Sequence, residues 1–241
     1  MRDLVHQYMI DPNPFVLFGL DHIIGTIVFL GLWIWLPTFS KNNLTKPRQE
    51  QLGIFLALIV MSNYLVWVGL EVIAGTFDLK LHLPFHLCRF ANLSIPIVII
   101  WKKERLFQVL YFWGMSGMLQ GAITPDATHG FPHFHYFRFF IAHNGMVLVL
   151  IYAIVVFDLR PSLKGLWDSF LALNVFLVFA AIVNLIFDSN YFWICGKPPT
   201  VSLLDYLGPW PWYILVAEFV ALVHYLFAYA PFYFLNKRIQ S

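Results

Sequence analysis

The sequence predicts an all-α polytopic membrane protein, a bundle of seven transmembrane helices that forms one integral membrane domain over residues 1–241. The chain is 60% hydrophobic and only 12% charged, whereas soluble domains average about 25% charged residues. The apolar residues also gather in long blocks that reach or approach the roughly 20 residues a helix needs to cross a bilayer. No polar stretch is long enough to form a separate soluble domain.

The apolar blocks give the predicted helices in chain order. Their ranges are 14–38, 51–73, 85–101, 106–123, 134–157, 166–188 and 209–234. The chain start lacks the apolar core of a cleavable signal peptide, so we expect the first block to act as its own insertion signal. The third and fourth blocks are the shortest, and only the sequence KKER separates them, which indicates a tight hairpin.

Basic residues indicate the orientation. The segments 39–50, 102–105 and 158–165 and the C-terminal tail hold ten of the fifteen lysines and arginines. The positive-inside rule then predicts an N-terminus outside and a C-terminus in the cytoplasm, in a multi-pass protein of the cell membrane. The net charge of +2 is too small to indicate nucleic acid as a partner.

Polar side chains are concentrated toward the predicted outer side. Eight of the nine histidines fall there, with most of the embedded acidic and amide residues. Ionisable groups inside a membrane are costly and usually face a protein-lined or wet cavity. This distribution predicts a polar cavity open to the extracytoplasmic face. Its candidate substrate-binding residues are Arg89, Arg138, Asn92, Gln120, Glu218 and Asn184.

Cys88 is a candidate nucleophile in the sequence LHLPFHLCRF. A thiol near a helix N-terminus and beside a cation is activated toward thiolate chemistry. Helical rotation points Cys88 away from His86, so a base must come from another helix. Two alternatives stay open: Cys88 is a small buried apolar residue, or it forms a disulfide with Cys195 in an oxidising compartment.

His143 is the candidate general acid or base. It lies about 14 Å below the outer end of its predicted helix, and its reference pKa suits proton transfer near neutral pH. The alternative is a core histidine that hydrogen-bonds Asn184 or Glu218. His86 is a further candidate, placed to orient a substrate or stabilise an oxyanion.

Arg89 and Arg138 have two interpretations. A guanidinium matches the geometry of a lipid phosphate, which predicts binding of a phospholipid. Embedded charges also pair with one another, so ion pairs with Asp21, Glu71, Asp188 or Glu218 are the structural alternative.

His129, His133 and His135 cluster before the fifth helix, and clustered histidines can bind zinc. No H-E-x-x-H motif accompanies them. The pattern therefore favours histidines at the membrane interface, with no metal and no cofactor.

Five motifs in fixed order resemble a known family. They are LPFHLCRFANLSIPI, YFWGMSGMLQGAITPD, FPHFHYFRFFIAHNG, NLIFDSNYFWICGKPPT and SLLDYLGPWPWY, within about Leu52 to Tyr233. Together they resemble the YwaF family of bacterial integral membrane proteins. That family is distantly similar to transmembrane protein 164, a cysteine- and histidine-dependent phospholipid acyltransferase, and more loosely to the androgen-induced fatty-ester hydrolases.

The resemblance has residue-level implications. The eukaryotic catalytic histidine matches His143 in FFIAH, and His86 also matches. The position of the eukaryotic cysteine is Phe85, and Cys88 follows it by about one helical turn. The resemblance implies a membrane enzyme that handles acyl esters.

The function predicted from the sequence is a membrane-embedded acyltransferase or ester hydrolase acting on a phospholipid or another acylated substrate. An alternative is a non-enzymatic transporter or binding protein for lipids or small molecules. A third interpretation is a zinc-dependent membrane hydrolase built on the histidines.

Overall fold

The structure is a computed structural model that describes residues 2–11, 13–125, 127–199 and 202–240. It is all helical, and the described residues form no strand beyond one isolated bridge between Pro14 and His129. Its elements are α1 (Arg2–Ile10), α2 (Leu20–Asn43), α3 (Lys46–Ala74), α4 (Leu87–Trp101), α5 (Glu104–Trp113), η1 (Gly114–Met118), α6 (Leu119–Ile123), α7 (Phe134–Phe140), η2 (Ile141–Gly145), α8 (Met146–Phe157), α9 (Leu163–Phe187), η3 (Tyr191–Trp193), η4 (Leu203–Tyr206) and α10 (Trp212–Gln240).

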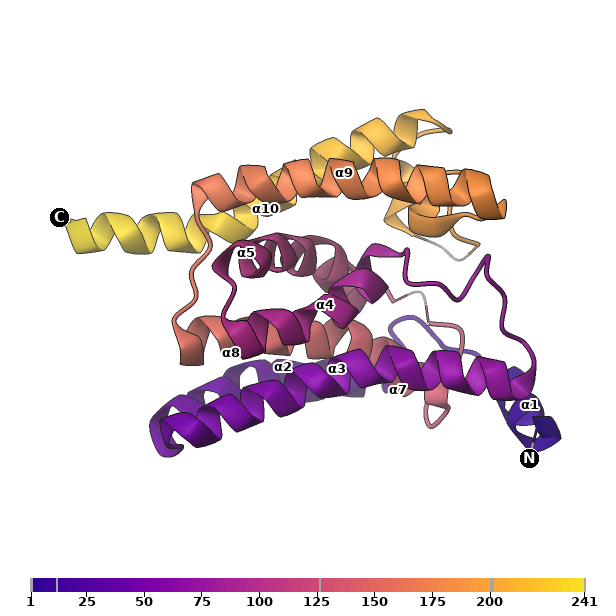
Figure 1. Ribbon diagram of the computed structural model, residues 1–241, viewed down its shortest axis with the longest axis horizontal. Coiled ribbons are helices and arrows are strands. Elements are labelled where there is room, and N and C mark those ends of the chain that lie inside the picture. The colour runs from indigo at the N-terminus through magenta and orange to yellow at the C-terminus, as the bar shows by residue number, and fades with distance from the viewer. Residues whose placement is uncertain (1, 12, 126, 200–201, 241) are drawn as a thin grey trace.

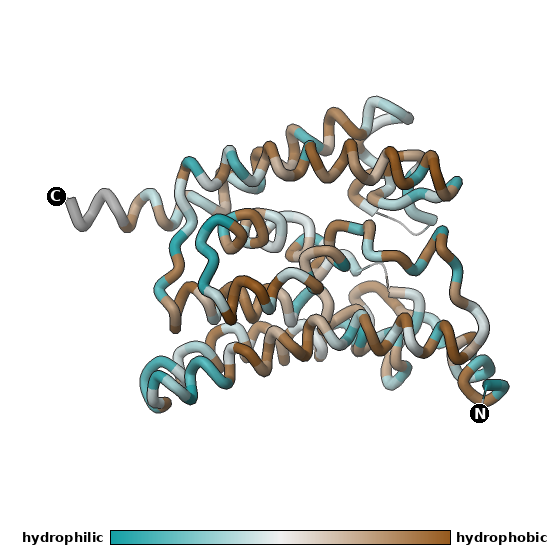
Figure 2. The backbone as a smooth tube through the Cα atoms, in the orientation of Figure 1, coloured by the Kyte–Doolittle hydropathy of each residue, from teal (hydrophilic) through white to brown (hydrophobic). Residues whose placement is uncertain are grey.

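The helices lie in two outer groups with shorter helices between them (Figure 1). Helices α2 and α3 form one side, α9 and α10 form the other, and α4 and α5 lie between the two sides. The closest pairings are α3 with α4, α2 with α8, and α5 with α9. Apolar residues run along the helices, and polar residues concentrate at turns such as the one joining α2 to α3 (Figure 2).

Among the described residues, five helices are long and apolar enough to cross a membrane. They are Leu20–Asn43, Lys46–Ala74, Phe134–Phe157, Leu163–Phe187 and Trp212–Leu235. Block 85–101 became the 15-residue helix α4, and block 106–123 became the interrupted run α5–η1–α6. Each predicted block is therefore helical, while the count of seven spans and the orientation of the termini stay predictions.

The N-terminal region differs from the prediction in two ways. The first long helix begins at Leu20 rather than near residue 14, because Pro14 and a short turn precede it. The preceding segment forms a separate helix, α1, whose Met9 is buried against Tyr64 and Trp67 of α3. Tertiary packing against α3 stabilises a short helix that the sequence pattern alone did not indicate.

The helix Phe134–Phe157 is the centre of the bundle. Of its apolar stretch, 67% is buried inside the protein, against 11–33% in the other four long helices. Met146, Leu150 and Ala153 are fully buried and pack with the core side chains of α4 and α5. Outward residues of the peripheral helices stay exposed, such as Leu185 and Phe227, as expected for surfaces that face lipid.

Candidate active site

Cys88 and His143 come together from two different helices. Cys88 is the second residue of α4, and His143 is the middle residue of η2 in the central helix. The two side chains approach each other closely enough for a polar contact between the thiol and the imidazole. A thiol and an imidazole within hydrogen-bond reach are the minimal nucleophile and base of a cysteine-dependent acyl-transfer enzyme.

The His143 ring is held in one tautomer. Its Nδ1 atom lies 3.0 Å from the carbonyl oxygen of Phe139, which can only accept, so Nδ1 carries the proton. Nε2 then keeps its lone pair, as a base requires. The ring stacks on Phe139 at 4.1 Å, and on its other side lies Gly121, where a Cβ would be 3.1 Å from Nε2. The absence of a side chain at Gly121 thus makes room for the imidazole.

Two π-helical turns adjoin this pair. His143 lies in η2, and η1 is the neighbouring π turn on the α5–α6 run that carries Gly121; the two turns contact each other. A π turn adds one residue to a helical turn, which rotates the side chains on either side of it, and such turns are frequent at functional sites. The side-chain spacing of a regular α-helix therefore does not predict the position of His143.

The N-terminus of α4 presents backbone amides that have no acceptor within the helix, and they lie beside Cys88. His86 is the N-cap residue, and the first intrahelical bond runs from the Phe90 amide to the His86 carbonyl at 3.1 Å. The amides of Leu87, Cys88 and Arg89 precede that bond and have no intrahelical acceptor. Such amides and the helix dipole stabilise negative charge at this end of a helix.

His86 lies close to the thiol in sequence but faces elsewhere. Its ring packs against Tyr191 at 5.3 Å and Trp193 at 5.0 Å. These aromatics belong to η3, so His86 connects the start of α4 to the segment after α9. This contact suits a positioning role.

Arg89 and Arg138 share one aromatic ring. The Arg89 guanidinium lies 4.5 Å and the Arg138 guanidinium 4.1 Å from the Trp67 ring centroid. Arg89 also donates to the carbonyls of Leu81 and Leu83. Both cations act electrostatically on Cys88. The indole therefore gathers two positive charges near the thiol, as cation–π attraction allows.

The expected ion pairs between Arg89 and the embedded carboxylates do not form among the described residues. Glu71 instead accepts from the Trp67 indole at 2.8 Å and lies 3.8 Å from His82. Asp188 pairs with Lys80 at 2.6 Å, which lowers the pKa of that carboxyl. The Arg89 guanidinium therefore has no carboxylate partner among the described residues and can bind another anion.

A largely apolar cavity of about 230 Å³ is lined by residues adjacent in sequence to this site. It is bounded by the start of α4, by η1 and α6, and by α9, η4 and α10. Leu87, which precedes Cys88, and Gln120, which precedes Gly121, both contribute to its wall. Glu218 also lines it and accepts a 2.9 Å hydrogen bond from Asn174.

The two candidate asparagines lie in different places. Asn92 is buried on α4, one turn from Cys88 on the same face, and its Oδ1 has no hydrogen-bond partner among the described residues. Asn184 bonds the Tyr191 backbone at both its amide and carbonyl, and it accepts from Ser189. These bonds give Asn184 a structural role in the turn after α9, away from His143.

Both cysteines have free thiols. Cys195 is exposed, and its backbone amide donates to Asn190 at 2.9 Å within the turn that follows η3. Cys88 is half-buried against His143. The structure therefore keeps Cys88 available for chemistry.

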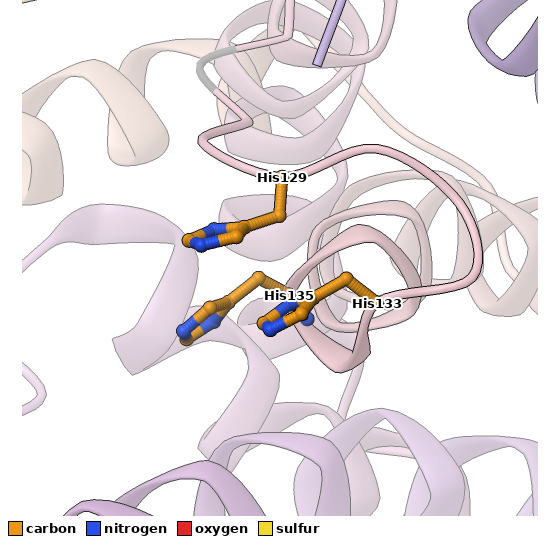
Figure 3. Close-up of side chains that lie close together, drawn as sticks. All are labelled: His129, His133 and His135. Carbon is orange, nitrogen blue, oxygen red and sulfur yellow. The ribbon is translucent and has the colours of Figure 1, made fainter. Parts of the chain in front are cut away.

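The three clustered histidines lie at the start of the same central helix. One ring nitrogen from each histidine lies within 4.8 Å of those of the other two, and Figure 3 shows the three rings close together. Burial, together with the neighbouring His133, lowers the pKa of His129, which lies in the loop before α7. The cluster is separate from the Cys88–His143 pair.

Comparison with known proteins identifies the family. A family model described as the TMEM164 family matches residues 17–229. The chain belongs to the TMEM164 family. An uncharacterized protein of Treponema pallidum (strain Nichols) is 24% identical over 225 residues, which cover 92% of each chain. No solved structure matches.

Membership of the TMEM164 family agrees with a membrane protein of acyltransferase type. The apolar helices support the same membrane assignment. The narrower resemblance to the YwaF family stays a prediction. Sequence reasoning did not anticipate Phe139, Gly121 or Trp67, because their roles depend on contacts between helices.

Proposed function

We propose that this TMEM164-family protein is a membrane-embedded acyltransferase that works through a thioester on Cys88. The observation that carries the proposal is the close approach of the Cys88 and His143 side chains from two different helices. A base that reaches the thiol from another helix, in a fixed tautomer, is the arrangement that nucleophilic catalysis requires. The substrate class we propose is a phospholipid or another acylated lipid of the cell membrane.

In the first half-reaction, His143 Nε2 takes the proton from the Cys88 thiol. The sulfur attacks the ester carbonyl, and a tetrahedral oxyanion forms. Free amides at the start of α4 and the Arg89 cation are placed to stabilise that charge. The C–O bond then breaks, and His143 returns the proton to the leaving alcohol, which leaves an acyl group on Cys88.

In the second half-reaction, an acceptor hydroxyl enters where the first alcohol left. His143 takes its proton, the oxygen attacks the thioester, and the C–S bond breaks. The proton returns to the Cys88 sulfur, and a new ester leaves. Water as the acceptor gives hydrolysis by the same steps, so transfer and hydrolysis differ only in the acceptor.

The surroundings of the pair suit a lipid. Arg89 and Arg138 supply two cations on the faces of Trp67, which match the charge of a phosphate headgroup. The apolar cavity beside Leu87 has the character needed to hold an acyl chain. Gln120 and Glu218 are among its polar lining residues.

The test is acyl exchange in liposomes that contain the purified protein, a phospholipid with an isotopically labelled acyl chain, and a lysophospholipid acceptor. Cys88→Ser and His143→Gln are each expected to lower the exchange rate by about 10²–10⁴-fold. Mass spectrometry of the wild-type protein is expected to find the labelled acyl group on Cys88, released by hydroxylamine.

Cys195→Ser is the matched control, because Cys195 is the other thiol and is exposed on a turn. It is expected to keep wild-type exchange and to leave acylation unchanged. Exchange that survives in both Cys88→Ser and His143→Gln would overturn the proposed mechanism.

A further inference from the structure

The cavity described above has walls from three helical segments. Leu173 and Leu177 line it from α9, Ala217 and Ala221 line it from α10, and Gly117 lines it from η1. Helix α10 contacts both α9 and η1, so these segments enclose a shared space. Its wall is mostly aliphatic and aromatic, and a wall of this kind favours the hydrocarbon part of a ligand.

The polar side chains of the wall already have hydrogen-bond partners inside the protein. Buried polar groups that are paired in this way do not need a polar ligand. The cavity therefore suits a hydrocarbon chain better than a polar molecule. The groups with partners are Ser116, which donates to Phe112, Gln120, which donates to Thr124, Glu218, which accepts from Asn174, and His224, whose Nδ1 lies 2.8 Å from the Val220 carbonyl.

The cavity is elongated along α10. Its lining extends from Tyr213 to Tyr225, twelve residues apart, or about 18 Å by helical rise. At the first end, the Tyr213 hydroxyl donates to the carbonyl of Trp193, whose ring lies 5.0 Å from that of His86. This end of the cavity therefore lies against the start of α4, where Cys88 is the second helical residue.

The second end of the cavity lies away from the start of α4. Tyr225 is only 1% exposed, and its ring lies 5.3 Å from that of Phe112 on α5. The run α5–η1–α6 leads from Phe112 past Gly117 to Gln120, which precedes the glycine beside His143. The cavity thus extends from the neighbourhood of the Cys88–His143 pair to a buried aromatic floor.

Gly117 leaves part of the wall open. A Cβ at Gly117 would meet no atom within 4 Å, although the residue lines the cavity. Gly114 belongs to the same π turn and differs, because a Cβ there would clash with the Leu150 side chain. The space beside Gly117 is therefore part of the cavity, and a larger side chain at this position would occupy it.

We propose that this cavity holds the transferred acyl chain and that the substrate is a lipid with a long acyl chain. Gly117 and Ala221 are then specificity-determining residues, because their small size leaves room for the chain. This inference rests on the proposed function, since the chain's carbonyl must reach Cys88. Its first carbons lie near Trp193, it passes Gly117, and its methyl end points toward Tyr225.

The kinetic test uses p-nitrophenyl esters with four-, eight- and sixteen-carbon acyl chains, whose hydrolysis releases p-nitrophenolate. Each methylene group that can no longer enter the cavity lowers kcat/KM about fourfold. Leu at position 117 fills the space of about three such groups. Gly117→Leu is therefore expected to lower the ratio of kcat/KM for the sixteen-carbon ester to that for the four-carbon ester about 50-fold.

Ala221→Leu tests the direction of the chain. Ala221 lies eight residues beyond Tyr213, about 12 Å along α10, so only the far part of a long chain reaches it. This variant is expected to lower the sixteen-to-eight ratio of kcat/KM, whereas Gly117→Leu is expected to lower the eight-to-four ratio as well. Gly31→Leu is the matched control, because a Cβ at Gly31 also meets nothing within 4 Å but Gly31 lies on α2. It is expected to keep all wild-type ratios.

A binding measurement separates this inference from the proposed function. Cys88→Ser protein in liposomes is irradiated with a phospholipid whose sixteen-carbon chain carries a diazirine at its methyl end. The label is expected on the peptides that contain Leu173 and Tyr225, and Gly117→Leu is expected to reduce it at least about tenfold.

The outcomes of the two tests are distinct. Labelling of these peptides by a protein that never releases p-nitrophenolate would overturn the Cys88 mechanism and support the acyl-chain site. Wild-type chain-length ratios in Gly117→Leu, or labelling confined to lipid-facing residues such as Leu185, would overturn the acyl-chain site even where exchange itself is observed.

Discussion

His143 and His135 lie on one helix, eight residues apart, and their side chains have different neighbours. His143 meets a thiol, and its other nitrogen is fixed by the Phe139 carbonyl. His135 meets two more imidazoles and has a buried nitrogen without a partner among the described residues. The first arrangement supports proton transfer, whereas in the second the His133 ring caps the start of α7 by accepting from the His135 amide. The chemistry of a histidine is thus set by the helices packed around it.

The two sites also differ in how they are supported. The Cys88–His143 pair relies on helix geometry: a π turn, the start of α4 and a glycine that leaves room for the ring. The histidine cluster relies on the N-terminal segment, whose carbonyls hold two of its rings. Changes in the helices should therefore affect the first site, and changes in α1 should affect the second.

Gly121→Ala should have the largest effect on the Cys88–His143 pair. The added Cβ would lie 2.8 Å from His143 Cδ2 and 3.1 Å from Nε2, so the ring must leave the thiol. We expect kcat for acyl exchange to fall about 100-fold, because a displaced base loses its proton-transfer geometry.

Gly69→Ala is the control for Gly121→Ala, since a Cβ there meets nothing within 4 Å. It should keep wild-type kcat. Equal kcat in Gly121→Ala and Gly69→Ala would mean that the position of the His143 ring does not matter for exchange.

Gly165→Ala should lower stability while leaving both sites intact. A Cβ at Gly165 would lie 1.5 Å from Gln108 Oε1, an atom that accepts from the Ser162 amide and hydroxyl. We expect the free energy of unfolding to fall by about 1–3 kcal/mol, as overpacking usually costs. Thermal unfolding in detergent measures this, with Gly31→Ala, in open space, as the control.

If Gly165→Ala abolishes exchange in protein that remains folded, then the Cys88–His143 geometry is coupled to the far end of α9. That outcome would contradict the view that the pair is positioned locally by α4, η1 and η2.

Trp67→Leu should weaken substrate binding at the Cys88–His143 site. The change removes the shared ring face from Arg89 and Arg138, and each cation–π contact contributes about 0.5–2 kcal/mol. We expect KM for an anionic phospholipid to rise about tenfold with little change in kcat. Kinetics on phosphate-bearing and neutral acyl lipids measure this, and the neutral lipid should show no effect.

Trp101→Leu is the matched tryptophan change, since Trp101 is 60% exposed at the far end of α4. It should leave KM unchanged. A similar rise in KM for Trp101→Leu would attribute the effect to membrane anchoring rather than to the arginines.

The sequence predicted the helices well and the contacts between them poorly. Seven apolar blocks all became helical, since burial of apolar residues in lipid requires internally bonded backbone. The pattern missed α1, whose stability depends on packing against Tyr64 and Trp67. It also missed both π turns, because they depend on the packing of the helices rather than on residue period.

The candidate site residues stay predictions, and their arrangement could not be predicted from the sequence. Helical rotation correctly separated His86 from Cys88, yet only the fold brings His143 to that thiol. Asn184, a candidate substrate-binding residue, makes local hydrogen bonds to Tyr191 and Ser189 in the turn after α9. The clustered histidines were expected at the membrane interface, and the turn before α7 stacks their rings.

His82 gives the smallest expected effect, and it tests the loop that joins α3 to α4, outside both sites. Burial lowers the pKa of His82 from its usual 6.5, while Glu71 at 3.8 Å opposes that shift and Arg89 adds to it. The unfolded state therefore binds more protons than the folded state once the pH falls below about 6.5, and stability is lost as the pH decreases through that window. Since Asn keeps an acceptor near the Asp78 amide, His82→Asn should flatten the dependence of Tm between pH 7.5 and about 5.5. If the dependence of Tm on pH is unchanged in this variant, another group, such as His129, dominates the acid sensitivity. The cluster before α7, rather than this loop, would then be the first part of the fold to respond to pH.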